Sequence, residues 1–409
     1  MRILFLAQFF APEPFFKGLP FALELARRGH HVEVLTGFPN YPGGKVYPGY
    51  RILPFQRETL QGIRVNRVPL YPSHSASAIG RVLNYASWAL SASLLGPLAV
   101  RRADVAYVYH PPATVGLPAT VLSALRGIPF VYDIQDLWPD TLATTGMLSN
   151  PRILGGIDRW CSFVYRRAAH LVVLSPGFKR KLAERGVPPE KISFIPNWCD
   201  ETAGVPPPYN EDVARGLGML GRFNIVFAGT MGKGQALDAV LAAADICAEK
   251  NPRIQFVFVG GGIDKARLEE KSRGKRNVLF LPYRPVSEMP ALFSVADVLL
   301  VHLKDDPLFS ITIPSKTQAY LAAAKPILMA VRGDAADIVS AAGAGLLANP
   351  GDAGSVAAAA LAMAQFPPER LQAMGEAGRH YYQRELCFSH GVSRLEEVFT
   401  AVINNRVRK

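Results

Sequence analysis

Short apolar runs alternate with segments of helical period along almost the whole chain. Residues 2–7 predict a first buried strand, residues 18–29 carry apolar side chains at helical spacing, and residues 31–36 predict a second strand. Further strands are predicted at 63–68, 105–109, 129–133 and 171–174. Strands that alternate with helices are typical of parallel sheets with right-handed crossovers. The pattern therefore predicts an α/β fold.

The chain of 409 residues is longer than one typical domain, so two domains are expected. A stretch rich in proline and turn residues, 196–208, interrupts the alternation and predicts a stiff interdomain linker. The alternation then resumes, with strands predicted at 224–228, 254–259, 278–281, 298–302 and 326–330. We therefore predict domains over residues 1–200 and 201–385, followed by a C-terminal helix over residues 386–409.

Basic side chains are concentrated in the first half of the chain. Of the formal net charge of +12, residues 1–200 contribute about +10, from 22 basic and 12 acidic side chains. Such a surface attracts nucleic acid, anionic lipid or phosphorylated substrates. Nucleic acid is not expected as a partner, because neither a basic-aromatic recognition motif nor zinc-finger spacing is present. The four cysteines lack Cys-x-x-Cys pairing, which argues against a zinc site and favours a reducing, cytoplasmic compartment.

An apolar stretch between Arg81 and Arg101 has three interpretations. It is either a helix buried in the first domain, a helix that docks on a membrane surface, or a transmembrane span. Asn84 and the Gly96-Pro97 pair weaken the third interpretation. The arginines at both ends of residues 82–100 favour contact with anionic lipid.

A strand, a glycine-rich turn and a helix follow one another near residue 230. The N–H groups and the positive dipole end of such a helix form an anion site. Glycines let the backbone approach a ligand closely, and a lysine adds a mobile charge that can follow a phosphate. The predicted anion-binding residues of this turn are Gly229, Thr230, Gly232 and Lys233. The alternative is a loop with a solvated lysine.

A second anion site is predicted where Pro314 opens a helix. Pro suits the first helical turn, and the N–H groups of Ser315, Lys316 and Thr317 would face an anion. The alternative is an ordinary capped helix, but two such helix starts in one domain favour a diphosphate ligand. A third glycine turn lacks the acidic partner of a dinucleotide fold, so no nicotinamide cofactor is expected. The further donor-side candidates are Gly260, Gly261, Arg284 and Tyr320.

Three segments of the first half lie at predicted strand carboxyl ends, where open α/β sheets bind ligands. Glu13 and Asp136 are candidate acid–base or hydroxyl-binding groups, although Asp136 could instead cap a helix. Trp138 could stack on a sugar, and His110 is as well suited to packing as to catalysis. The predicted acceptor-side residues are Gly18, Asn40, Tyr41, His110 and Trp138.

Four motifs occur in the order typical of one enzyme family: FPNYPGG (38–44), DLWPD (136–140), IPNWCD (195–200) and PSK (314–316). With them the chain resembles the family 4 retaining glycosyltransferases of the GT-B fold. Within that family it is most similar to the bacterial L-fucosamine transferases of surface-polysaccharide assembly. The resemblance implies two Rossmann-like, doubly wound domains facing a cleft, with the last helix crossing back to the first domain.

The resemblance also implies the substrates. A UDP-sugar donor, here an N-acetylated deoxy-hexosamine, would bind the second domain, where Lys233 matches the diphosphate-binding lysine of the family. The acceptor would be a polyprenyl-diphosphate-linked saccharide at an anionic membrane surface, so the enzyme would be peripheral to the inner face of a bacterial plasma membrane. Lys233, with Asp136 and Glu13, would carry the chemistry. No metal is expected, because no Asp-x-Asp motif is present.

The chain departs from the family pattern at several positions. Thr230 replaces an arginine next to the diphosphate, for which Arg284 is a possible substitute. Ile311 and Ala319 occupy the positions of a Glu-x7-Glu pair. These losses keep two other functions open: a UDP-sugar 2-epimerase, which needs no acceptor, and a non-catalytic scaffold that binds nucleotide sugars.

Overall fold

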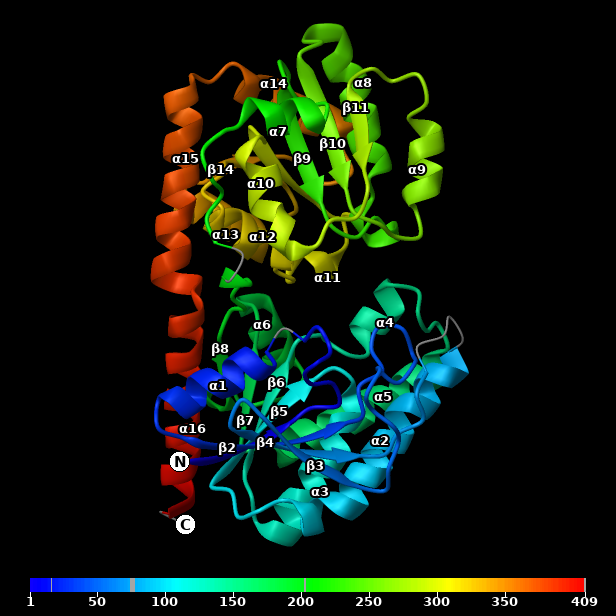
Figure 1. Ribbon diagram of the computed structural model, residues 1–409, viewed down its shortest axis with the longest axis vertical. Helices are drawn as coiled ribbons and strands as arrows, with labels where there is room; N and C mark the ends of the chain where they lie inside the picture. The colour runs from blue at the N-terminus through cyan, green and yellow to red at the C-terminus, as the bar shows by residue number, and fades with distance from the viewer. Residues whose placement is uncertain (16, 74–77, 202–203, 408–409) are drawn as a thin grey trace. The chain divides into compact units, whose positions relative to one another are not determined.

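The computed structural model describes residues 1–15, 17–73, 78–201 and 204–407, and it divides into two compact units (Figure 1). Unit 1 comprises Met1–Leu174, Phe178–Ile195 and Val392–Lys409, and unit 2 comprises Ser175–Gly177 and Pro196–Gly391. The stretch predicted as an interdomain linker belongs to unit 2, where Trp198 packs edge-on against Phe388 with ring centroids 5.2 Å apart.

Unit 1 contains a sheet with the strand order β3-β4-β2-β1-β5-β6-β7-β8. All neighbouring strands are parallel except the antiparallel pair of β3 and β4. The strands are β1 (Arg2–Leu6), β2 (His31–Gly37), β3 (Gln56–Leu60), β4 (Ile63–Val68), β5 (Val105–His110), β6 (Phe130–Ile134), β7 (His170–Val173) and β8 (Ile192–Phe194). The predicted α/β fold is confirmed.

Helices cover both faces of this sheet (Figure 1). They are α1 (Leu19–Arg27), α2 (Ala78–Ala99), α3 (Gly116–Arg126), α4 (Asp140–Thr144), α5 (Pro151–Arg167), α6 (Pro176–Glu184) and α16 (Phe388–Val407), with 3-10 turns η1 (Ala113–Val115) and η2 (Pro189–Lys191). Phe21 of α1 and Phe399 of α16 both pack edge-on against Tyr107 of β5. On the other face, Tyr132 of β6 meets Tyr165 of α5.

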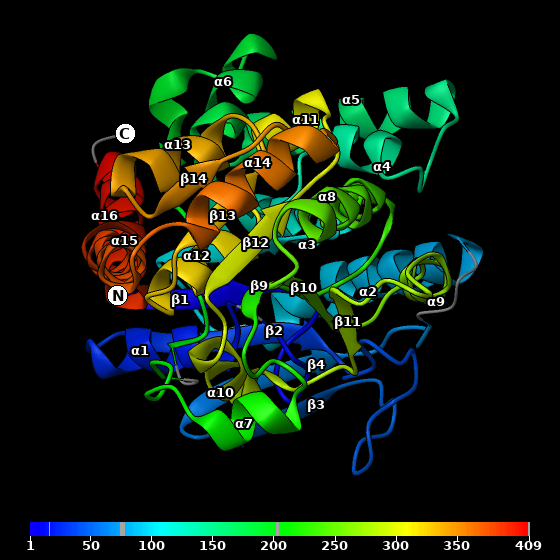
Figure 2. The same cartoon turned by 90° about the horizontal axis from the view of Figure 1, so that it is seen from above.

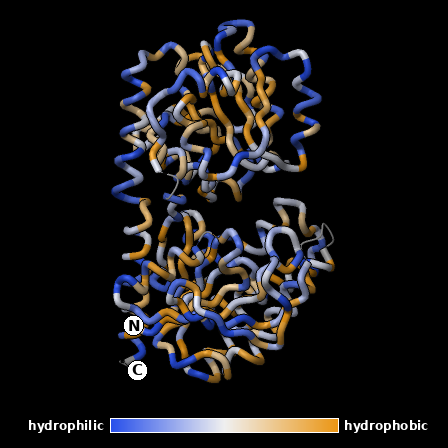
Figure 3. Tube along the Cα trace, viewed as in Figure 1, coloured by the Kyte–Doolittle hydropathy of each residue, from blue (hydrophilic) through white to orange (hydrophobic). Residues whose placement is uncertain are grey.

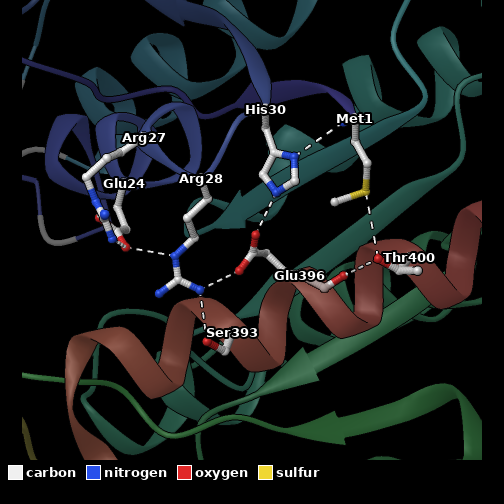
Figure 4. A network of polar contacts seen from close by, with 8 residues as sticks. All are labelled: Met1, Glu24, Arg27, Arg28, His30, Ser393, Glu396 and Thr400. Carbon is white, nitrogen blue, oxygen red and sulfur yellow. Dashed lines mark hydrogen bonds and ion pairs between the residues drawn. The ribbon is translucent and has the colours of Figure 1, made fainter.

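The C-terminal helix α16 is fixed to unit 1 by polar contacts as well (Figure 4). The carboxylate of Glu396 pairs with Arg28 at 2.5 Å and with Nε2 of His30 at 2.6 Å. Arg28 also donates to the hydroxyl of Ser393. The last part of the chain thus completes the core built by the first.

Helix α2 has one face in unit 1 and one face in solvent. Trp88 and Ala92 are fully buried, and the amide of Asn84 donates to Oδ1 of Asn40 at 3.0 Å. The opposite face exposes apolar side chains, which we call the α2 stripe: Ile79, Val82, Leu83, Leu90, Leu94 and Leu98. Across the described ranges, no helix combines the length and apolarity needed to cross a membrane.

Unit 2 contains a parallel sheet with the strand order β11-β10-β9-β12-β13-β14. The strands are β9 (Phe223–Ala228), β10 (Ile254–Val259), β11 (Val278–Leu281), β12 (Val298–His302), β13 (Ile327–Ala330) and β14 (Gly345–Leu347). Apolar residues are concentrated in the central strands of each unit (Figure 3). Strands buried on both faces have this composition because helices cover both sides.

The helices of unit 2 are α7 (Glu211–Gly216), α8 (Asp238–Lys250), α9 (Lys265–Lys271), α10 (Met289–Ser294), α11 (Pro307–Ser310), α12 (Ser315–Ala322), α13 (Asp334–Ala342), α14 (Ala353–Ala364) and α15 (Pro368–Tyr381). Short turns are η4 (Lys233–Gln235), η5 (Val286–Glu288) and the π-helical turn η6 (Tyr382–Leu386). Helices α8 and α14 share one core with the sheet, and α10 and α12 lie on its other face (Figure 2).

Candidate functional site

A cavity of about 920 Å³ opens in unit 2 at the carboxyl ends of β9, β10 and β12. Such ends are where open α/β sheets bind ligands, and the volume suits a molecule of nucleotide-sugar size. The predicted donor residues that line it are Gly229, Thr230, Gly260, Gly261, Arg284, Ser315, Lys316 and Tyr320. The structure therefore brings most of the predicted donor side together.

The two glycine turns on one wall of the cavity are joined backbone to backbone. The N–H of Gly229 donates to the carbonyl of Val259 at 2.8 Å, and that of Met231 donates to the carbonyl of Gly261 at 2.7 Å. Gly229 and Gly260 have φ angles of +137° and +131°. A Cβ on Gly260 would collide with the carbonyl oxygen of Gly229. Both glycines are therefore required by conformation, and Gly260 also by close approach.

The first turn of α12 forms the facing part of the cavity. Pro314 is the N-cap, and Ser315 is exposed at the first helical position. Early N–H groups of a helix lack intrahelical acceptors. Thr317 is an exception, since its N–H donates to the carbonyl of Pro314 at 2.9 Å and its side chain is buried away from the cavity. Ser315 and Lys316 thus remain as the backbone donors predicted at this helix start.

The side chain of Lys316 lines the cavity, whereas the sequence predicts a role only for its backbone N–H. Its Nζ lies 4.1 Å from the ring centroid of Phe227 and close to Gly229, and burial lowers the pKa of the ammonium to about 8. Among the described residues, no carboxylate lies within ion-pair distance of this nitrogen. A partly buried ammonium without a counter-charge favours an anionic group beside it.

Lys233 occupies a different position from the one predicted. It is exposed on η4, and neither it nor Gly232 lines the cavity. Helix α8 starts only at Asp238, so its N-terminus does not follow the glycine turn directly. Instead Oε1 of Gln235 accepts from the N–H of Gly232 at 3.0 Å, which closes the turn on itself.

Two further predicted donor residues have partners that define their roles. The hydroxyl of Tyr320 accepts from the N–H of Ala228 at 3.0 Å, and so holds the end of β9. Arg284 lines the cavity and pairs with Glu288 at 2.8 Å. The first contact is structural, whereas the second leaves much of the guanidinium for a ligand.

Part of the cavity lining was missed from the sequence. Cys199 and Asp200 lie in the IPNWCD motif, and Glu201 follows it. The motif supports the family resemblance, but the sequence alone indicates no role for these residues. Helix α15 and η6 add Arg379, Tyr382 and Gln383, and Cys387 directly follows η6. Helical positions 379 and 383 carry no local signal, because polar residues at this spacing are also typical of a solvated helix face.

In unit 1, Glu13 joins two of the predicted acceptor residues. Its Oε1 accepts from the N–H groups of Asn40 and Tyr41, both at 2.7 Å, and its Oε2 accepts from the N–H of Phe10 at 3.0 Å. Burial raises the pKa of the carboxyl, and these three backbone bonds oppose the shift. Glu13 therefore organises the loops after β1 and β2.

The other predicted residues of unit 1 lie near the ends of β5 and β6. His110 is buried, its ring lies 5.5 Å from that of Trp138, and burial lowers the pKa of the imidazole to about 3. Burial raises the pKa of Asp136. Tyr85 of α2, which the sequence had not indicated, interacts electrostatically with Tyr41 and Asp136.

Two further predictions concern Gly18 and a metal site. Gly18 is the N-cap of α1, where a Cβ would come within 2.9 Å of the carbonyl oxygen of Phe15. In the part of the chain that the structure describes, no three His, Cys, Asp or Glu side chains gather in a way that could hold a metal ion. That the reaction needs no metal stays a prediction from the sequence.

Comparison with known proteins identifies relatives for both halves. The glycosyl transferase 4-like domain matches residues 20–198, and glycosyl transferases group 1 matches residues 222–365. WcaI of Escherichia coli K12, assigned as a glycosyl transferase of colanic acid biosynthesis, is 31% identical over 316 residues, covering 73% of this chain and 74% of WcaI. WbjE of Pseudomonas aeruginosa, assigned as a glycosyltransferase, is 28% identical over 56% of this chain and 57% of WbjE.

Solved structures share the fold at low sequence identity. Sucrose-phosphate synthase of Thermosynechococcus elongatus has a TM-score of 0.71 at 15% identity, covering 99% of both chains. Anabaena HepE in complex with UDP-glucose has a TM-score of 0.69 at 16% identity, covering 98% of this chain and all of HepE.

Proposed function

Because the chain belongs to the family 4 glycosyltransferases of the GT-B fold, we propose that it moves a sugar from a UDP-sugar to a polyprenyl-diphosphate-linked saccharide in surface-glycan synthesis. We propose retention at the anomeric carbon, and an N-acetylated deoxy-hexosamine as the sugar, from resemblance to the L-fucosamine transferases. The colanic acid assignment of WcaI and the UDP-glucose complex of HepE support the glycan class and the donor nucleotide.

The observation that carries the proposal is the partly buried ammonium of Lys316 in the cavity of unit 2. Cleavage of the bond between the sugar C1 and the phosphate oxygen passes through an oxocarbenium-like state, while negative charge develops on the departing diphosphate. Lys316 and the N–H groups of Ser315 and Lys316 would stabilise that charge in place. Lys233 on η4 is a second, exposed cation that a diphosphate could recruit, and no metal enters this mechanism.

The acceptor is proposed to bind unit 1. Asp136 and Tyr41, brought near Tyr85, offer hydrogen-bonding groups for a saccharide hydroxyl, and Trp138 offers an aromatic face. The raised pKa of Asp136 suits a group that exchanges a proton with a hydroxyl. The α2 stripe and the basic first half suit peripheral attachment to the anionic inner face of a bacterial membrane.

A screen of UDP-sugars against polyprenyl-diphosphate-N-acetylglucosamine, with product mass as the readout, tests the proposal. A product one sugar heavier supports it. Conversion of a UDP-sugar without acceptor would identify a 2-epimerase instead. Tight binding of UDP-sugars without any transfer or conversion would identify a scaffold.

A further inference from the structure

Part of the wall of the donor cavity is lined by alanine side chains, which offer a ligand no hydrogen bond. Besides Ser315, Lys316 and Tyr320, helix α12 contributes Ala319 and Ala322 to the lining, and Ala323 directly follows the helix. The ribose and the transferred sugar of a nucleotide sugar both carry vicinal hydroxyls, and buried hydroxyls require partners. The family resemblance places a glutamate at Ala319, where this chain has only a methyl group.

Helix α15 lies unusually close to this alanine wall. A Cβ on Gly375 would collide with the carbonyl oxygen of Ala324, directly after α12. A Cβ on Gly378 would come within 3.0 Å of Leu321 and of Ala344. Two glycines on successive turns therefore let α15 pack tightly against α12 and present its next residues to the same cavity.

The π-helical turn η6, which follows α15, is anchored at its first residue. The hydroxyl of Tyr382 donates to Oε1 of Glu201 at 2.7 Å and accepts from the N–H of Cys199 at 3.1 Å. The N–H of Phe388 donates to the same carboxylate oxygen at 2.8 Å. Since π-helical turns are often found at functional sites, an anchored one that lines a cavity is notable. The anchor fixes the positions of the neighbouring side chains.

Arg379 and Gln383 are those neighbours, and both line the cavity. Arg379 is half-buried, and within the described ranges it forms no ion pair with a carboxylate. Gln383 is exposed, so its amide is accessible to a ligand. A guanidinium donates in a fixed geometry, and an amide both donates and accepts, which together match two adjacent hydroxyls.

We propose that Arg379 and Gln383 bind a vicinal diol of the nucleotide sugar and replace the carboxylate absent at Ala319. This inference rests on the proposed function, since it presupposes a nucleotide-sugar donor. The diol belongs either to the ribose or to the transferred sugar, and the experiment below separates the two.

Calorimetric titrations with UDP, 2′,3′-dideoxy-UDP and UDP-N-acetylglucosamine test the proposal on the full-length wild type, Arg379→Ala and Gln383→Ala. Arg370→Ala is the matched control, because Arg370 is on the same helix but exposed, over the ring of Phe366. If the ribose diol is bound, each cavity variant loses roughly tenfold in UDP affinity, whereas affinity for 2′,3′-dideoxy-UDP is unchanged. If the sugar diol is bound, UDP affinity is unchanged and affinity for UDP-N-acetylglucosamine falls.

Two outcomes would overturn the inference. Wild-type affinities in both cavity variants would show that neither Arg379 nor Gln383 contacts the donor. An equal loss for UDP and 2′,3′-dideoxy-UDP would assign the contact to the phosphates instead of a hydroxyl pair. A wild type that binds none of the three ligands would refute the proposed function itself, and circular dichroism of every variant checks that the fold is intact.

Discussion

At the scale of single residues, the proposed reaction depends most on the ammonium of Lys316. Lys316→Ala should lower turnover by about 10²- to 10³-fold, the usual loss when one preorganised charge-stabilising group is removed. The fold should persist, because the lysine has no ion-pair partner among the described residues. Lys233→Ala is the comparison in the same transfer assay: an equal or larger loss there, with little effect at Lys316, would return the leaving-group role to Lys233.

The lowered pKa of Lys316 also predicts how the affinity for UDP depends on pH. The free protein has an ammonium below a pH of about 8 and loses it as the pH rises through that value. The affinity for UDP should therefore fall between about pH 7 and pH 9.5 in the wild type but not in Lys316→Arg, whose guanidinium stays charged. Calorimetry across this range checks the difference, and parallel curves for the two proteins would argue against the assignment.

His302 at the end of β12 holds the glycine turn in place. Its Nδ1 lies 2.7 Å from the carbonyl oxygen of Gln235, and its Nε2 lies 3.3 Å from the N–H of Gly351. Burial lowers the pKa of the imidazole, so the neutral ring donates through Nδ1 and accepts through Nε2. His302→Leu would leave both backbone groups unpaired, at about 1–3 kcal/mol, and should weaken UDP binding.

His110 is the matched control for His302. It ends β5, which lies beside β1 as β12 lies beside β9, and it is equally buried. Neither of its ring nitrogens has a hydrogen-bond partner in the described structure. Urea unfolding and UDP titration of His110→Leu should show a smaller loss of stability and no loss of UDP affinity. If the two substitutions affect UDP binding alike, His302 does not act through the glycine turn.

At the scale of elements, α2 has apolar side chains on both its buried and its exposed face. The α2 stripe exposes Leu90, Leu94 and Leu98 by 57%, 74% and 86%, and burying each leucine in lipid is worth about 1.5–3 kcal/mol. Replacing these three by glutamine should abolish flotation with anionic vesicles. Ile263→Gln, at an 81% exposed position of unit 2, should float like the wild type. A wild type that stays unbound at low salt would contradict membrane docking.

The elements also show what local sequence could predict. The buried parallel strands were found, because strands covered on both faces are continuous apolar runs. Strands β3, β8 and β14 were missed, and each lies at an edge of its sheet. Strand β3 is polar, so its pairing with β4 depends on the neighbour and not on its own composition, and β8 and β14 are only three residues long. Glycines marked the turns of the donor cavity, but the burial of Lys316 depends on Phe227, which is distant in sequence.

At the scale of the whole molecule, the order of the segments along the chain does not match their division between the two units. The first unit is completed by α16, which follows nearly two hundred residues of the second. The family resemblance indicated such a helix, whereas the apolar periodicity of the helix alone could not say which core it joins. The reason is physical: the partners of Phe399 and Glu396 are Tyr107, Arg28 and His30, all in the first third of the chain.

This arrangement predicts which parts of the protein a substitution in α16 destabilises. Phe399 is fully buried against Tyr107, so Phe399→Ala should cost about 3–5 kcal/mol. Because α16 belongs to unit 1 from Val392 on, hydrogen exchange should accelerate in peptides of β1, β5 and α1 and stay slow in the sheet of unit 2. Phe258→Ala, in the core of unit 2, is the reciprocal control and should accelerate exchange in β9 and β10 while unit 1 stays protected. Uniform acceleration by either substitution would instead mean that the two units unfold as a single cooperative body, and the unit-specific role of the last helix would have to be abandoned.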